Sequence, residues 1–121
     1  MNNVEKSVFF FGVYVILLGI ILLLIPDFFI GIFGLPETTD VWIRVAGMLV
    51  LLVGYYYVRA GRDGEGMAKF FRWTVHTRSS VIVFFIIFVL FDLVKPILIL
   101  FGVIDLLGAI WTGLALRSSE S

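Results

Sequence analysis

The stretch KPILILFGVIDLLGAIWTGLALR, residues 95–117, decides how this chain folds. It holds about twenty consecutive apolar or small residues, the length that one helix needs to cross a bilayer. A single acid, Asp105, lies near its middle, roughly 12 Å from Ile97 and roughly 16 Å from Leu116 by helical rise. An acid at that depth costs about 2.5–3.5 kcal/mol to insert unless a partner satisfies it. We therefore interpret the rest of the chain as the surroundings of Asp105.

The composition is that of an integral membrane protein. Of the 121 residues, 61% are hydrophobic and 15% are charged, and the mean hydropathy is +1.12. A soluble domain of this size could not bury so much apolar surface. The formal net charge is zero, so we expect no nucleic-acid partner. The chain contains no cysteine, which excludes disulfides, thiolate metal sites and thiol catalysis.

Hydropathy along the chain predicts an all-α, antiparallel four-helix membrane bundle in a single domain over residues 1–121. The predicted spans are residues 7–25, 41–60, 70–93 and 96–116. Residues 28–40, after the first span, are apolar but too short to cross, and glycines and a proline interrupt them. We expect them to form a short segment at the membrane interface, followed by a loop.

Small and aromatic residues indicate how the first two spans pack. Gly12 and Gly19 are seven residues apart on one helical face, which lets another backbone approach closely. Arg44 shares a face with Gly47, so it either faces other helices or extends to the lipid headgroups. Trp42 and the run Tyr55–Tyr57 flank the second span and are expected to form aromatic belts at the two interfaces.

The third span begins with three basic side chains, Arg72, His76 and Arg78. Arg72 and His76 share one helical face, and Arg78 lies well around the helix from them. His76 is the only histidine, so it cannot alone form a zinc or bis-histidine haem site, and we expect no metal and no cofactor. A hydrogen-bonded structural role near the interface is the default for His76, with proton transfer as the alternative.

The face of the fourth span around Asp105 is built of small residues, including Gly102 and Ala109, with Thr112 beside them. Asp105 should therefore point into the bundle. We expect it to pair with Arg44 or Arg78, directly or through one water. Alternatively, it stays protonated and bonds to a neighbour such as Thr112. The candidates for a polar seam or a ligand site are Asp105, Arg44, Arg78, His76, Arg72 and Thr112.

Four spans place both termini on the same side of the membrane. That side carries seven lysines and arginines: Lys6, Arg59, Arg62, Lys69, Arg72, Arg78 and Arg117. The other side carries two, Arg44 and Lys95. Basic residues are retained in the cytoplasm, so we predict a cell (inner) membrane protein with both termini cytoplasmic.

Three patterns support a family resemblance: W-x-R-x-x-G at residues 42–47, F-R-W-T at 71–74, and F-G-x-x-D-x-x-G-A-x-W-T at 101–112. In these the chain resembles small four-helix bacterial membrane proteins and, more loosely, the DoxX-like group. The resemblance implies a four-helix bundle with a polar seam, near a lipid, a quinone or another hydrophobic ligand. It implies no reaction.

The residues favour a non-enzymatic role. There is no nucleophile motif, and a single carboxylate within the spans cannot support a two-acid mechanism. The first hypothesis is a structural or accessory protein, monomeric or homo-oligomeric, held by an Asp–Arg seam. The second is a binder of a hydrophobic small molecule in a cavity near Arg44, His76 and Asp105. The third is a proton-coupled transporter using Asp105, although no span has the interruption often found at such sites.

Overall fold

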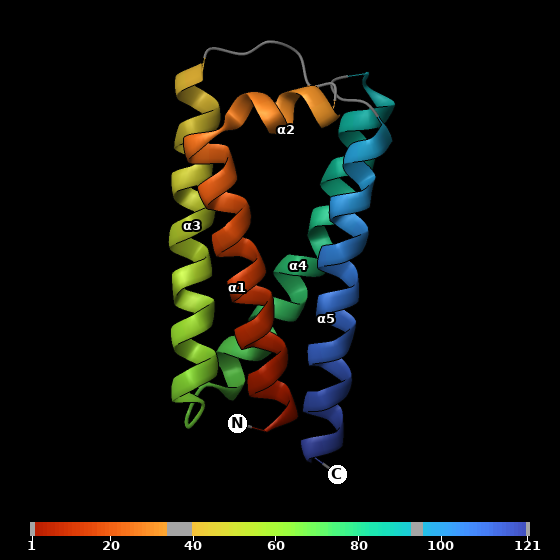
Figure 1. Cartoon of the computed structure of the whole chain (residues 1–121). Coiled ribbons are helices and arrows are strands. Elements are labelled where there is room, and N and C mark those ends of the chain that lie inside the picture. The colour runs from red at the N-terminus through yellow and green to blue at the C-terminus, as the bar shows by residue number, and fades with distance from the viewer. Residues whose placement is uncertain (1, 34–39, 93–95, 121) are drawn as a thin grey trace.

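The computed structural model describes residues 2–33, 40–92 and 96–120, and within them it is helical with no strand. The elements are α1 (Asn3–Leu24), α2 (Pro26–Phe33), α3 (Asp40–Asp63), α4 (Ala68–Leu90), the 3-10 turn η1 (Pro96–Leu98) and α5 (Ile99–Glu120) (Figure 1). Four segments are long and apolar enough to cross a membrane: α1, α3, α4 and η1 continuing into α5. The all-α prediction is confirmed.

The long helices extend beyond the predicted spans at the end of the molecule where the two termini lie (Figure 1). Helix α1 starts at Asn3 because the side chain of Asn2 caps it, accepting a hydrogen bond of 2.8 Å from the Glu5 amide. Helix α3 continues to Asp63 and α4 begins at Ala68, so the connection between them is shorter than the gap at residues 61–69 between the predicted spans. Gly64 and Gly66 make that turn with positive φ angles of 60° and 79°.

The short segment after the first span is helix α2, which crosses the other end of the bundle at a steep angle to the long helices (Figure 1). It begins at Pro26, whose fixed φ suits the first position of a helix. The predicted segment therefore starts two residues earlier than expected. Residues 34–39, which belong to the predicted segment and loop over residues 28–40, lie outside the described residues.

The long helices pack as two pairs, α1 with α3 and α4 with α5. Glycines allow the close approach in the first pair. A Cβ atom on Gly12 would lie 2.8 Å from Tyr57 Cβ, and one on Gly19 would lie 2.6 Å from the Leu51 amide nitrogen. The prediction that Gly12 and Gly19 mark a face of close packing is confirmed, and its partner is α3.

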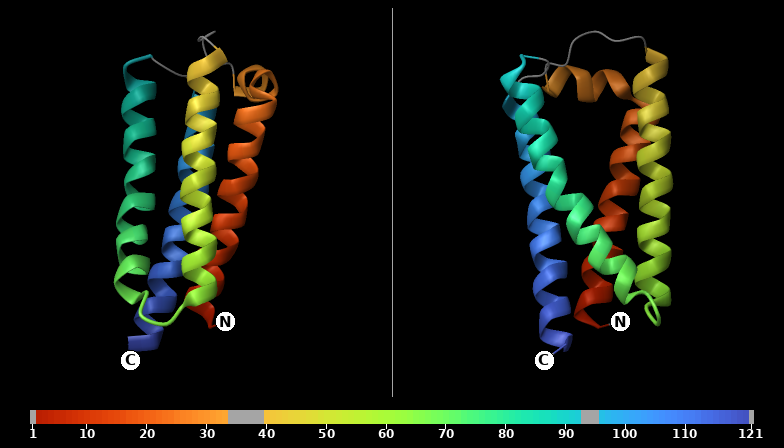
Figure 2. Two further views of the ribbon diagram at one scale, coloured as in Figure 1. Left: turned by 90° about the vertical axis from the view of Figure 1, so that its left-hand side faces the viewer. Right: turned by 180° about the vertical axis from the view of Figure 1, so that it is seen from behind.

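The two pairs join at the end that carries the termini, where α1 packs on α5. The buried cluster there consists of Val4, Val8, Phe11, Tyr57, Ala60, Phe71, Ala115 and Leu116. Towards α2 the pairs diverge, and α3 lies near α4 only where the short turn connects them (Figure 2). This divergence creates the space that the candidate site occupies.

Tyr57 departs from the predicted aromatic belt. Trp42, Tyr55 and Tyr56 are exposed, as a belt requires, but Tyr57 is only 9% exposed and packs against Phe70. Three consecutive helical residues point about 100° apart, so they cannot all face outward from a packed helix. Tyr57 thus belongs to the core.

Candidate functional site

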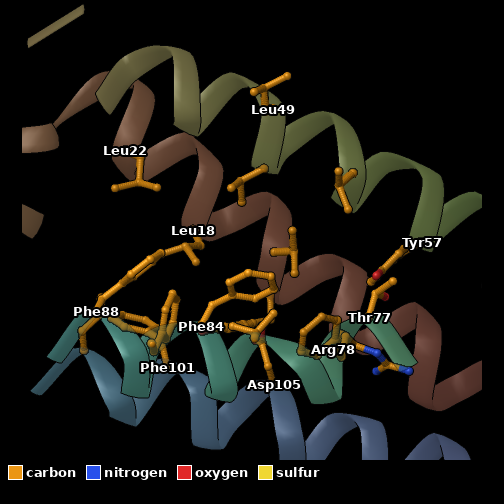
Figure 3. A pocket seen from close by; sticks show the side chains of 18 residues that line it. Leu18, Leu22, Leu49, Tyr57, Thr77, Arg78, Phe84, Phe88, Phe101 and Asp105 are labelled. Atoms are coloured by element: carbon orange, nitrogen blue, oxygen red, sulfur yellow. The ribbon is translucent and has the colours of Figure 1, made fainter. Parts of the chain in front are cut away.

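A pocket of about 630 Å³ lies between the two helix pairs (Figure 3). Its volume is within the range of roughly 300–1,000 Å³ that is usual for small-molecule sites. Helices α1, α3, α4 and α5 and the turn η1 all contribute to its walls. Its lining is Phe11, Tyr14, Val15, Leu18, Leu22, Leu49, Val50, Val53, Tyr57, Thr77, Arg78, Val81, Phe84, Phe85, Phe88, Leu98, Phe101 and Asp105.

Most of the pocket wall is aromatic or aliphatic. On α3 the lining residues Leu49 and Val53 are exposed to solvent, and so is Phe84 on α4. Because α3 and α4 share little packing along their described length, this side of the pocket is open. The pocket is therefore an apolar chamber with a lateral opening between α3 and α4.

Polar side chains occur at a limited set of positions in the lining: Tyr14 on α1, Tyr57 on α3, Thr77 and Arg78 on α4, and Asp105 on α5. Each of the four long helices thus contributes at least one. Tyr57, Thr77 and Arg78 lie towards one end of the chamber, with Asp105 between them and the middle, whereas Leu22 and Phe88 line the other end (Figure 3). The chamber has a polar end and an apolar end.

Arg78 is fixed at the polar end by three hydrogen bonds. Its Nε donates to the Thr74 carbonyl at 3.1 Å, and its Nη2 donates to Thr74 Oγ1 at 3.0 Å and to Thr112 Oγ1 at 2.8 Å. The guanidinium carbon also lies 4.7 Å from the centroid of the Phe11 ring, within the range of a cation–π contact. With 2% of its surface exposed, Arg78 is held in one orientation.

The hydrogen bonds continue from Arg78 through Thr112 to α1. Ser7 Oγ and Thr112 Oγ1 are 2.7 Å apart, and both residues are fully buried. Ser7 Oγ also bonds the Val4 carbonyl at 2.7 Å, which uses its only proton. Thr112 must therefore donate to Ser7 while it accepts from Arg78. This chain of bonds, the Arg78–Thr112–Ser7 network, joins α4, α5 and α1.

Two buried polar atoms of the pocket lining have no hydrogen-bond partner among the described residues: Arg78 Nη1 and Tyr14 Oη. A Cβ atom on Gly108 would lie 3.3 Å from Arg78 Nη1, so this nitrogen lies against α5 one turn from Asp105. Buried donors are rarely left without acceptors, because each costs about 1–3 kcal/mol or more if charged. The polar end of the pocket therefore has unused hydrogen-bonding capacity.

Of the residues predicted for the site, Arg78, Asp105 and Thr112 come together around the polar end. Asp105 lines the pocket, which confirms that it faces other helices. Arg78 makes no direct hydrogen bond to it, since the bonds of Arg78 go to Thr74 and Thr112, and Nη1 has no partner within residues 2–33, 40–92 and 96–120. A contact through one water stays a prediction.

The direction of helical side chains explains why the direct contact is not formed. In an α-helix the Cα–Cβ bonds tilt towards the N-terminus. Helix α4 begins at the end where the termini lie, and α5 begins at the end near α2 (Figure 1). Arg78 and Asp105 therefore extend in opposite directions, and Arg78 reaches threonines instead.

The other predicted candidates lie outside the pocket. Arg44 is half-buried and its Nη1 donates to the Leu23 carbonyl of α1 at 2.6 Å, so it faces a neighbouring helix. Arg72 and His76 are exposed on α4. The hydrogen bond expected of His76 stays a prediction.

Sequence reasoning missed five polar residues of this region: Ser7, Tyr14, Tyr57, Thr74 and Thr77. Thr74 had a detectable signal, because it lies one helical turn before Arg78 and on the same face. Ser7 stands among apolar residues at the start of the first span, but no local pattern links it to Thr112, which is 105 positions away. Tyr14 carries no signal beyond being a polar-tipped residue within an apolar run.

Comparison of the chain with protein-family models, with curated proteins and with solved structures gave no match. The resemblance to the DoxX-like group therefore rests on the sequence patterns alone. Any functional proposal must come from the geometry of the pocket and from the charge pattern of the chain.

Proposed function

We propose that this protein is a non-enzymatic, multi-pass membrane protein that binds an amphiphilic small molecule in the pocket between its two helix pairs. The observation that carries the proposal is the pocket itself, an apolar chamber of about 630 Å³ in which four helices supply a small number of polar groups. This combination of apolar walls and a few convergent polar side chains is typical of small-molecule sites.

The lateral opening supports access from the bilayer. Exposed apolar residues on α3 and α4, such as Leu49 and Phe84, border the opening and would face lipid in an antiparallel bundle that spans a membrane. An apolar ligand dissolved in the bilayer could then enter without crossing water. The bilayer, in this proposal, is both the solvent of the protein and the source of its ligand.

A structural or accessory role is the second candidate, and the Arg78–Thr112–Ser7 network favours it. This network fixes three helices relative to one another at the end opposite α2. Buried polar contacts of this kind can specify one packing arrangement. A purely structural role, however, makes no use of the chamber or of the open donors at its polar end.

Filling the chamber tests the two candidates. Leu18 lines the pocket, whereas the neighbouring Leu17 is exposed on the outside of α1. We expect Leu18→Trp to lower the retention of 1-monoolein, a single-chain amphiphile, by about tenfold, corresponding to about 1.4 kcal/mol. Native mass spectrometry of protein reconstituted with that lipid measures the retention.

Leu17→Trp is the matched control, because it places the same side chain on the lipid-facing side of the same helix. It should retain the amphiphile as the wild type does. Circular dichroism must show equal helicity for both variants. Equal retention by the two variants would remove the support for ligand binding and leave the structural role.

The proposal includes the orientation in a cell (inner) membrane, with both termini in the cytoplasm. The seven-to-two distribution of lysines and arginines supports it, because basic residues near short loops are retained in the cytoplasm. We expect a reporter that is fluorescent only in the cytoplasm to be active when fused after Ser121. A periplasmic phosphatase fused at the same position should be inactive, and the reverse result would invert the topology.

A further inference from the structure

The polar end of the pocket also indicates the chemistry of the ligand's head group. Resting on the proposed function, we infer that the head group is uncharged and carries both a hydrogen-bond acceptor for Arg78 and a hydroxyl donor for Asp105. A long-chain monoacylglycerol has this chemistry.

The requirement for an acceptor comes from Arg78. A guanidinium has five N–H donors and no acceptor. Three donors are used by Thr74 and Thr112, which leaves the two on Nη1, and this atom is buried without a partner among the described residues. Because those three bonds hold the group in place, Arg78 cannot turn Nη1 towards solvent. Since Arg78 lines the pocket, a ligand acceptor in the pocket would be the partner for this nitrogen.

The requirement for a donor comes from Asp105, which lines the pocket from α5. A carboxylate is an acceptor only, with two oxygens that each take more than one hydrogen bond. Since Arg78 extends away from Asp105 to its threonine partners, the carboxylate is open to a donor in the chamber. A hydroxyl on the ligand would bind there, and the hydroxyl of Tyr14 on α1 offers a further partner.

The charges at the polar end favour a neutral head group. Arg78 and Asp105 line the same pocket, and an ionised Asp105 would balance the charge of Arg78. A carboxylate on the ligand would approach the acid, and an ammonium would approach the arginine, in surroundings where like charges repel more strongly than in water. A neutral head group with a carbonyl and hydroxyls bonds to both without adding charge.

The test compares three probes that share an oleoyl or oleyl chain and differ in the head group: 1-monoolein, oleate and oleylamine. The protein is placed in phosphatidylcholine nanodiscs and its retained probe is counted by native mass spectrometry. The wild type is expected to retain monoolein about tenfold better than either charged probe. Asp105→Asn removes the negative charge with little change in shape, and we expect it to raise oleate retention about tenfold.

Asp27→Asn is the matched control, because Asp27 is an exposed acid on α2 that does not line the pocket. It should leave the preference unchanged. If the wild type retains the three probes equally or prefers oleate, the head-group inference is overturned while the pocket remains a binding site. If no probe is retained, ligand binding itself fails. Should Asp105→Asn not fold, the preference of the wild type alone decides the matter.

Discussion

Replacing Gly19 with alanine is expected to weaken the contact between α1 and α3 and to lower the free energy of unfolding by about 1–3 kcal/mol. The added Cβ atom would lie 2.6 Å from the Leu51 amide nitrogen and 2.8 Å from the Gly47 carbonyl oxygen. Both atoms belong to the backbone of a long helix, so neither can rotate away as a side chain could. The helices must move apart, and the reciprocal contact of Gly47 with α1 is lost with them.

Thermal unfolding in detergent, followed by circular dichroism, measures this effect. Gly113→Ala on α5 is the matched control, since its Cβ atom would meet nothing nearer than Val75 Cγ1 at 3.7 Å. There the higher helix propensity of alanine should raise stability by about 0.5–1 kcal/mol. The two substitutions thus have opposite expected signs. A stabilising effect at both positions would show that α1 and α3 do not pack through Gly19.

Sequence reasoning predicted the helices well because length and hydropathy dominate that decision. It also identified the close-packing face of Gly12 and Gly19, since a small residue every seven positions is a local pattern. It also predicted that Asp105 faces other helices, because small residues such as Gly102 and Ala109 share its helical face. What it identified are properties of single helices, which a period of about 3.6 residues reveals.

The sequence pattern does not predict how the two helix pairs are arranged in space. The pocket exists because α1–α3 and α4–α5 join at one end and diverge at the other, and no local signal carries that geometry (Figures 1 and 2). A direct hydrogen bond between Arg78 and Asp105 is not formed. That expectation considered depth along the helix without the direction of the side chain, and the contact through one water stays a prediction. Tyr57 faces the core and not the membrane interface, because its angular position around α3 differs from those of Tyr55 and Tyr56.

Replacing Thr112 with valine is expected to lower the free energy of unfolding by about 2–4 kcal/mol, because it breaks the Arg78–Thr112–Ser7 network at its centre. Valine keeps the shape of threonine but provides no oxygen. Arg78 Nη2 then loses an acceptor, and a hydrogen bond to a charged group contributes about 1.5–3 kcal/mol. Ser7 loses its donor from α5, which adds about 0.5–1.5 kcal/mol.

Ser80→Ala provides the control for this substitution, because the Ser80 hydroxyl donates to the Thr77 carbonyl of its own helix and Ser80 does not line the pocket. Its effect should stay within about 0.5 kcal/mol. Ser7→Ala should be milder than Thr112→Val, since the bond between Arg78 and Thr112 persists. In the double variant the effects should add to less than their sum, as expected for residues that share a hydrogen bond. If Thr112→Val and Ser80→Ala unfold at the same temperature, the network does not hold α1, α4 and α5 together.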